Sequence, residues 1–234
     1  ASELEAIRSL VKRRRAFEPL AYLRGYREFY GRPFRVDARV LVPRPDTEIL
    51  VEVGLRSLAG RELAARVADL CTGSGCVAVT LKCERPLWNV DAVDLSPDAV
   101  QVARDNAARL GALWKLRIVC GDLFAPLGNE ARHYDLVTAN PPYIAHGEIA
   151  QLQPDIRLHE PHISLDCGAD GLEIVRRIVT DARERLRPGG VLAMEIGAGQ
   201  APVVMEFMTQ QGYSRVDVTR DYGGIERVVH GTFG

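Results

Sequence analysis

The feature that most constrains the fold is an alternation of short apolar runs with helical patterns that begins at residue 66. Apolar runs bounded by turn residues predict β-strands, and apolar residues at helical spacing predict α-helices. The expected strands lie at residues 67–71, 88–94, 116–120, 134–139 and 191–196, and the expected helices at 77–83, 97–110, 171–186 and 200–211. Such alternation predicts an α/β fold with a mostly parallel sheet and helices on both faces. Two last strands, at 213–219 and 226–231, are expected to pair and close the sheet.

The segment before residue 66 has a different organisation. We expect a helix at 3–15, a short helix at 18–25 that Gly25 stops, and a hairpin at 28–36 with Gly31-Arg32-Pro33 at its turn. A strand at 40–42 should lead through a proline-rich turn into a helix that ends at Gly60. The predicted division is therefore residues 1–27, residues 28–45 as a β-hairpin linker, and residues 46–234 as the main domain.

Composition fits one large domain, or one domain with an appendage. The chain has 234 residues, 47% of them hydrophobic, and a net charge of −1, which argues against a globally basic nucleic-acid-binding protein. Residues 1–45 nevertheless carry eleven Arg and Lys against five Asp and Glu. This basic arm is either a solvated helix surface or a surface for an acidic partner.

Cysteine usage and hydropathy bear on the compartment. The five cysteines form no Cys-x-x-Cys pair, which favours reduced thiols in a cytoplasmic protein over a disulfide scaffold or a metal site. No apolar run reaches the roughly 18 residues of a membrane span. The first residues do not resemble a signal peptide. Because the chain does not begin with methionine, we expect a fragment or a processed form.

The most specific motif is Asn140-Pro141-Pro142-Tyr143, directly after the apolar run 136–139. Each proline fixes its own φ and lacks an N–H, so the corner is rigid and offers acceptors. The Asn140 amide oxygen and the Pro141 carbonyl are suited to accept the two hydrogens of a planar –NH2 group, with Tyr143 stacked on its plane. Asn-Pro alone is more often an ordinary turn.

A glycine-rich loop follows the first strand of the alternation. Gly73 and Gly75 permit a tight turn and a close backbone approach by a ligand, and a helix follows. Asp94 ends the next strand, at the spacing of a ribose-binding carboxylate, although it precedes Ser96-Pro97 and is also placed to cap a helix. The loop by itself also fits a dinucleotide site. The candidate cofactor-binding residues here are Asp69, Cys71, Thr72, Gly73, Ser74, Gly75 and Asp94.

Asp122 and Leu123 follow the third strand of the set, after Gly121. Asp122 is placed to accept from an adenine amino group and Leu123 to pack on the ring, because ligands of open α/β sheets bind at the carboxyl ends of strands. A lone aspartate there is equally a turn former.

These motifs, in this order, resemble class I S-adenosylmethionine-dependent methyltransferases. The resemblance is closer to the protein-(glutamine-N5) methyltransferases that modify peptide chain release factors. It rests on residues 18–25, 28–31, 140–143, 159–161 and 170–172, and on the block Pro43-Arg44-Pro45-Asp46-Thr47-Glu48.

The resemblance implies a Rossmann-like fold, S-adenosylmethionine as cofactor, and methyl transfer to the glutamine of a Gly-Gly-Gln motif. It implies catalytic roles for Asn140, Pro141, Pro142 and Tyr143, with Asn140 also beside the cofactor. Residues 1–27 would be the remnant of a helical substrate-binding domain. Arg44 and Thr47 are candidates to close over the cofactor, and His159 and Glu160 to shape the substrate loop. The partner would be a release factor, with neither membrane nor nucleic acid involved.

Other functions share parts of the pattern. A glutamine methyltransferase acting on a ribosomal protein also carries Asn-Pro-Pro-Tyr, as does a DNA adenine methyltransferase, which would need a basic groove for its flipped base. A nicotinamide dehydrogenase would use the glycine loop and Asp94 but leave residues 140–143 without a task. A non-catalytic binding module would show neither cofactor nor methyl transfer.

Overall fold

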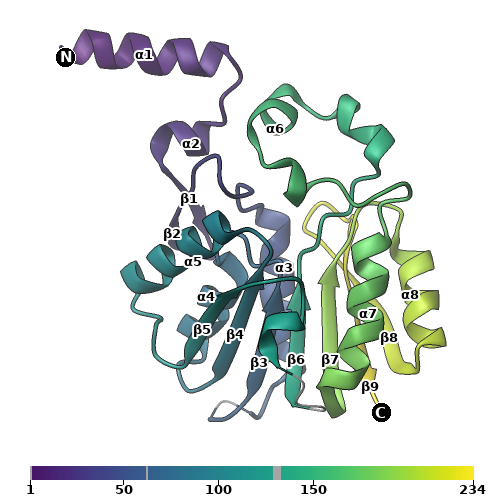
Figure 1. Cartoon of the computed structure of the whole chain (residues 1–234). Helices are drawn as coiled ribbons and strands as arrows, with labels where there is room; N and C mark the ends of the chain where they lie inside the picture. Colours follow the sequence, from purple (N-terminus) through teal and green to yellow (C-terminus); the bar gives the residue numbers. More distant parts are fainter. Residues whose placement is uncertain (1, 62, 129–132) are drawn as a thin grey trace.

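The computed structural model describes residues 2–61, 63–128 and 133–234. These residues contain a seven-stranded sheet in the order β5-β4-β3-β6-β7-β9-β8 (Figure 1). Its strands are β3 (Arg66–Leu70), β4 (Asn89–Asp94), β5 (Leu116–Cys120), β6 (Tyr134–Ala139), β7 (Leu186–Glu195), β8 (Tyr213–Arg220) and β9 (Glu226–Phe233). The pairs from β5 to β7 are parallel, whereas β9 pairs antiparallel with both β7 and β8. The predicted mostly parallel sheet with an antiparallel closing pair is confirmed.

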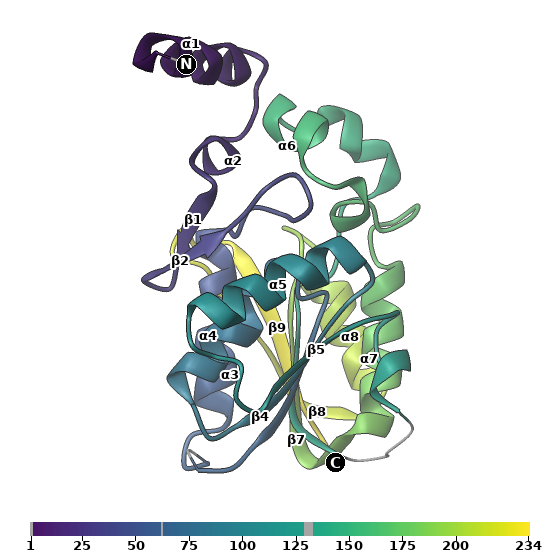
Figure 2. The ribbon, with the colours of Figure 1, turned by 60° about the vertical axis from the view of Figure 1, so that its left-hand side comes forward.

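Helices cover both faces of this sheet (Figures 1 and 2). One face carries α3 (Glu48–Ser57), α4 (Cys76–Glu84) and α5 (Pro97–Arg109), and the other carries α7 (Glu173–Arg185) and α8 (Ala201–Gln210). Because successive residues of a strand point to opposite faces, each strand contributes to two cores. In β3, Val67 belongs to the core under the first set of helices and Ala68 to the core under the second.

The strand order reverses between β3 and β6. From β3 the chain builds outward through β4 to β5, and then returns to place β6 on the other side of β3. In open α/β sheets, ligands bind beyond the carboxyl ends of the strands at such a reversal. This point therefore predicts the position of the site.

The amino-terminal segment projects from the carboxyl ends of the strands (Figures 1 and 2). Its elements are α1 (Glu3–Arg15), α2 (Leu20–Arg24), β1 (Tyr26–Phe29) and β2 (Arg32–Arg35). The β1–β2 hairpin is anchored by Phe29 and Phe34, which are both fully buried and meet edge to face with ring centroids 6.0 Å apart. In contrast, α1 buries none of its residues.

Short helices complete the chain. They are the 3₁₀-helices η1 (Pro45–Thr47), η2 (Ala125–Leu127), η3 (His146–Gln151) and η4 (His162–Ser164), and the α-helix α6 (Pro154–His159). Three of them, η3, α6 and η4, lie in the long connection 146–169, which rises above the carboxyl ends of the strands beside α2 (Figure 1). Among the described helices, none combines the length and apolar character needed to cross a bilayer.

Two local predictions are wrong. Residues 36–44 contain no strand, because the Val40 N–H bonds to the Asp37 carbonyl in a turn and the Val42 N–H bonds to a side chain, that of Glu160. The apolar alternation at 40–42 serves instead to pack Val40 and Val42 in a small core with Tyr22. The hairpin turn lies at Tyr30-Gly31, so that Pro33 falls inside β2 opposite Glu28.

Candidate active site

A cavity opens at the carboxyl ends of β3, β4 and β6, at the reversal of strand order. Ten of the predicted site residues line it: Asp69, Cys71, Thr72, Gly73, Ser74, Asp94, Asp122, Leu123, Asn140 and Pro142. Gly75, Pro141 and Tyr143 are adjacent in sequence but are not part of its wall. The fold thus brings the glycine loop and the Asn-Pro-Pro-Tyr corner to one hollow.

The glycine loop is shaped by its two glycines. Gly73 has φ +53° and nothing within 4 Å of where a Cβ would stand, so its backbone is open. Gly75 has φ +80° and is the N-cap of α4, and a Cβ there would lie 3.1 Å from the Ala103 Cβ on α5. Gly73 therefore gives a ligand access, whereas Gly75 permits close packing of the loop on a helix.

Asp94 holds the loop in place. Its Oδ2 accepts from the Gly73 N–H at 2.7 Å and its Oδ1 from the Ser96 N–H at 2.9 Å. Burial raises the pKa of this carboxyl, and the backbone N–H groups act in the opposite direction. The N-cap of α5 is Ser96, whose Oγ accepts from the Ala99 N–H at 3.2 Å. Asp94 is thus not the helix cap, and a carboxylate with further lone pairs lines the cavity.

Asp69 lies beneath the loop and is almost fully buried. Its oxygens accept from the Thr72 hydroxyl at 2.6 Å and from the Thr138 hydroxyl at 2.7 Å. Burial raises the pKa of Asp69 to about 6. The carboxyl joins β3, β6 and the glycine loop, so it supports the cavity floor.

Asp122 and Leu123 form a different wall. Asp122 Oδ2 accepts from Arg177 Nη2 on α7 at 2.6 Å, and both side chains are largely exposed. Leu123 is buried and has φ +46°, in the left-handed region that favours glycine. Cys71 has φ +57°. Non-glycine residues are uncommon in this region, and strained ones cluster at functional sites, where the surrounding fold compensates for their strain.

The Asn-Pro-Pro-Tyr corner is held from two sides. Asn140 Nδ2 donates to Thr47 Oγ1 at 3.3 Å, and Thr47 itself lines the cavity. The Tyr143 hydroxyl lies 3.5 Å from Glu195 Oε1 at the end of β7. The Tyr143 side chain is therefore directed at β7 rather than into the cavity wall.

Two residues important for this geometry are absent from the sequence-based site. Glu195 is 1% exposed, and burial raises its pKa to about 7. Asn106, on α5, is fully buried. In the sequence, Glu195 is marked as a site residue only by its position as a carboxylate at the end of an apolar run. No local sequence pattern distinguishes Asn106.

Comparisons with known proteins identify the family of this chain. Residues 46–154 match the model of the methyltransferase small domain. Over 232 residues the chain is 44% identical to a release factor glutamine methyltransferase from Geobacter sulfurreducens, covering 99% of this chain and 79% of that protein. A protein of the same name from Bordetella pertussis is 46% identical over 97% of this chain and 82% of its own length.

This chain belongs to the release factor glutamine methyltransferase family. A solved structure named as a release factor-specific protein-(glutamine-N5) methyltransferase, from Alicyclobacillus acidocaldarius, aligns with a TM-score of 0.50 and 29% identity. That alignment covers 86% of this chain and 99% of the other. The resemblance drawn from the sequence motifs is confirmed.

In this member of the family, two distant segments roof the cavity. Glu160 is 4% exposed, and its oxygens accept from Arg44 Nη2 at 2.5 Å and from the Val42 N–H at 3.2 Å. Burial raises the pKa of Glu160, while Arg44 acts in the opposite direction. His159 Nε2 lies 2.8 Å from the Ala16 carbonyl oxygen. These contacts join the connection 146–169 to the amino-terminal segment above the cavity.

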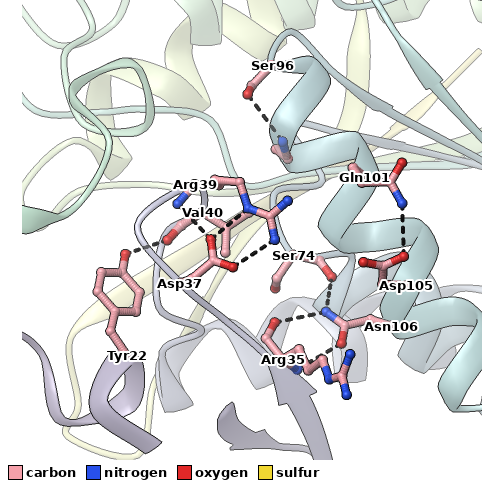
Figure 3. A network of polar contacts seen from close by, with 11 residues as sticks. Tyr22, Arg35, Asp37, Arg39, Val40, Ser74, Ser96, Gln101, Asp105 and Asn106 are labelled. Atoms are coloured by element: carbon pink, nitrogen blue, oxygen red, sulfur yellow. Dashed lines mark hydrogen bonds and ion pairs between the residues drawn. The ribbon is translucent and has the colours of Figure 1, made fainter. Parts of the chain in front are cut away.

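Figure 3 shows how Asn106 joins the hairpin to the glycine loop. Its Nδ2 donates to the Ser74 carbonyl at 2.9 Å and to the Arg35 carbonyl at 3.0 Å, and its Oδ1 accepts from the Arg35 N–H at 2.8 Å. In the same view the Tyr22 hydroxyl donates to the Val40 carbonyl at 2.6 Å. The hairpin is thus attached to the glycine loop through Asn106, and the segment that follows the hairpin is attached to α2 through Tyr22.

Proposed function

We propose that this chain transfers a methyl group from S-adenosylmethionine to the side-chain nitrogen of a glutamine in a peptide chain release factor, within its Gly-Gly-Gln motif. Family membership supports the reaction class and the substrate. The observation that carries the proposal is that Asn140, at a corner locked by two prolines, opens on the same cavity as the glycine loop and Asp94.

The residues around the cavity fit S-adenosylmethionine. Asp94 offers a carboxylate for the ribose hydroxyls, and Leu95 and Leu123 offer apolar surface for the adenine. The open backbone at Gly73 leaves room for close approach. Asp69, Cys71, Thr72, Ser74, Gly75 and Asp122 complete the proposed cofactor-binding set. When bound, this cofactor supplies a methyl group activated by its sulfonium.

An amide nitrogen is a poor nucleophile because its lone pair is delocalised into the carbonyl, so positioning must supply most of the acceleration. The Asn140 amide oxygen and the Pro141 carbonyl hold the two hydrogens of the glutamine –NH2 and direct its nitrogen. The same oxygens would stabilise the positive charge that develops on the nitrogen during transfer, and the methylated nitrogen would then lose one of its two hydrogens to water as a proton to give the neutral N-methylamide. Pro142 keeps the corner rigid, and Tyr143 supports the corner from the side of β7, where its hydroxyl lies 3.5 Å from Glu195 Oε1.

The amino-terminal part has a role in this proposal. Residues 1–27 contribute to holding the release factor, residues 28–45 link them to the catalytic part, and residues 46–234 form the methyltransferase domain. Reaction with a release factor requires neither a membrane nor direct nucleic-acid binding and would take place in the cytoplasm.

The first test is mass spectrometry of a release factor incubated with the protein and S-adenosylmethionine. One added methyl on the glutamine of the Gly-Gly-Gln motif supports the proposal. Methylation of a ribosomal protein or of adenine in DNA, with an unmodified release factor, contradicts it.

The second test is Asn140→Ala, which removes one of the two acceptors. We expect kcat to fall about 10²–10³-fold, as for loss of one preorganised polar group at a reacting centre. Cofactor affinity, measured by calorimetry, should change little. Asp94→Ala is the reciprocal control: it should weaken cofactor binding about 10–100-fold through loss of charge-assisted hydrogen bonds. Unchanged kcat in Asn140→Ala would contradict the role of the corner.

A further inference from the structure

Glu195 is a buried carboxyl group beside the Asn-Pro-Pro-Tyr corner that the proposed reaction does not use. It ends β7, is 1% exposed, and has its Oε1 3.5 Å from the Tyr143 hydroxyl. The Thr47 hydroxyl also faces this carboxyl and counteracts the effect of burial on its pKa. A buried carboxyl group costs free energy unless it has partners, so this arrangement calls for an explanation.

Thr47 joins Glu195 to Asn140. It is 2% exposed, and its Oγ1 accepts from Asn140 Nδ2 at 3.3 Å. A hydroxyl group has one hydrogen to donate, and an ionised carboxylate only accepts. Among the described residues, Glu195 Oε2 is buried without a hydrogen-bond partner, and the Thr47 hydroxyl lies near enough to this carboxyl to lower its pKa. This makes Glu195 the acceptor available for the Thr47 hydrogen, and it leaves a lone pair of the Thr47 oxygen for the Asn140 –NH2.

The contacts from Glu195 through Thr47 to Asn140 determine which end of the Asn140 amide faces the cavity. When Nδ2 is held by Thr47, Oδ1 is the end left for a ligand. In the flipped amide, the –NH2 would face the –NH2 of the substrate, and two donors cannot bond to one another. The proposed reaction thus depends on an orientation that the backbone of the corner does not by itself impose.

We propose that Glu195 and Thr47 are positioning residues that hold the Asn140 side-chain amide with its oxygen toward the substrate nitrogen. This rests on the proposed function, in which Asn140 receives the glutamine amide.

Protonation of Glu195 should allow the Asn140 side-chain amide to flip. A neutral carboxyl can donate, so it no longer requires the Thr47 hydrogen, which becomes available to Asn140 Oδ1 in the flipped amide. The groups that face Glu195 are the Tyr143 hydroxyl, Thr47 and Asp46 of η1, and Arg227 of β9. Cys76 of α4 also lies close enough to interact with it. Since burial raises the pKa of Glu195 to about 7, kcat should fall as the pH drops through that value.

Thr47→Val tests the link between Glu195 and Asn140 directly, because it keeps the shape of the Thr47 side chain and removes its hydroxyl. We expect kcat to fall about 10²-fold, the size of effect that a small misplacement of a reacting group produces. Cofactor affinity measured by calorimetry should be nearly unchanged. Thr47→Ser should restore most of the lost kcat, because it returns the hydroxyl.

The matched control is Thr80→Val. Thr80 is fully buried on α4, does not line the cavity, and has no hydrogen-bond partner for its hydroxyl among the described residues. This variant makes the same change inside the core without touching Asn140, so its kcat should equal that of the unaltered protein. Glu195→Gln supplies the second arm: the fall in kcat near pH 7 should disappear.

A third readout needs neither cofactor nor substrate. In the protein alone, NMR should show the Asn140 side-chain –NH2 signals, assigned by their absence in Asn140→Ala, shifted as for a hydrogen-bonded amide. Thr47→Val should move them and Thr80→Val should not. Any one of three results overturns the proposal. The first is a kcat for Thr47→Val equal to that of Thr80→Val, and the second is Asn140 –NH2 signals that do not move in Thr47→Val. The third is a kcat of Glu195→Gln with the same pH dependence as that of the unaltered protein. A protein that methylates no release factor but shows the NMR response would refute the proposed function and leave the orienting network standing.

Discussion

Two carboxyl groups near the cavity lie in surroundings that favour their neutral forms. Burial raises the pKa of Asp69 to about 6 and that of Glu195 to about 7. Asp69 receives two threonine hydroxyls at 2.6 and 2.7 Å, whereas the Tyr143 hydroxyl reaches Glu195 only at 3.5 Å. The Thr47 hydroxyl acts on Glu195 in the same direction as the Tyr143 hydroxyl. Because the ordinary pKa of a glutamate, 4.5, is higher than the 3.8 of an aspartate, burial raises the two pKa values to a similar extent.

The raised pKa of Glu195 predicts that the stability of the protein depends on pH. The pKa of Glu195 is raised above its usual 4.5, so the folded state holds this proton more tightly than the unfolded state. Its contribution is complete below the unfolded pKa and is lost as the pH rises through about 7. Between about pH 6 and about pH 8 the loss should be about 1 kcal/mol.

Urea unfolding of the protein and of Glu195→Gln at the two pH values measures this term. Asp69 titrates in both proteins, so the difference between them isolates Glu195. The glutamine variant should lose less stability on going to the higher pH. Parallel pH dependence in the two proteins would contradict the raised pKa.

At the scale of elements, α5 connects the hairpin to the glycine loop through one side chain. Asn106 makes three hydrogen bonds, two with Arg35 of β2 and one with the Ser74 carbonyl. The hairpin is also held by Phe29 and Phe34 in the core, by the Tyr30 N–H, which donates to Glu48, and by the ion pair between Arg32 and Glu84. Buried backbone groups that lose a partner are costly, so the hairpin and the loop should depend on Asn106 together.

Asn106→Ala should lower the free energy of unfolding by about 2–4 kcal/mol, because it leaves buried backbone groups without partners. It should also weaken cofactor binding, since the Ser74 segment lines the cavity. Asn89→Ala is the control of the same type at an exposed position, and should change stability by no more than about 0.5 kcal/mol. Denaturant unfolding and calorimetry provide both measurements, and equal effects of the two variants would contradict this role.

In the whole molecule, the cavity has a floor of strand ends and a roof from two segments far apart in the chain. Glu160 and His159 of the connection 146–169 contact residues 16–44, as the position of α6 beside α2 in Figure 1 allows. Beyond this roof α1 projects with Leu4, Ile7, Leu10 and Val11 exposed. These side chains add nothing to the described core.

The proposed role of residues 1–27 gives α1 a testable function. Replacing Ile7 and Leu10 together by glutamine keeps helix propensity and removes apolar surface. The free energy of unfolding should change by no more than about 0.5 kcal/mol, and cofactor affinity should be unaffected. The kcat/KM for release factor should fall, because apolar contact area is lost. An unchanged kcat/KM would exclude this face from substrate binding.

The sequence alone predicted those features that depend on local pattern. The alternation of strands and helices follows from which residues can be buried together, and it yielded the parallel sheet and its closing pair. Motifs in strand-end loops also yielded ten residues that line one cavity, because parallel strands carry their carboxyl ends to the same edge. The prediction of a strand at 40–42 is wrong because the apolar alternation there reflects packing on Tyr22 rather than pairing in a sheet.

Only the tertiary structure decided how the site residues are held. Asn140 meets Thr47 across 93 positions of sequence, Asn106 meets Arg35 across 71, and Glu160 meets Val42 across 118. Such contacts leave no period or spacing in the chain, because the partners come together only when separate elements pack. Burial acts in the same way: Glu195 is an ordinary glutamate in the sequence, and the strands and helices around it exclude the water that would otherwise keep its pKa near 4.5.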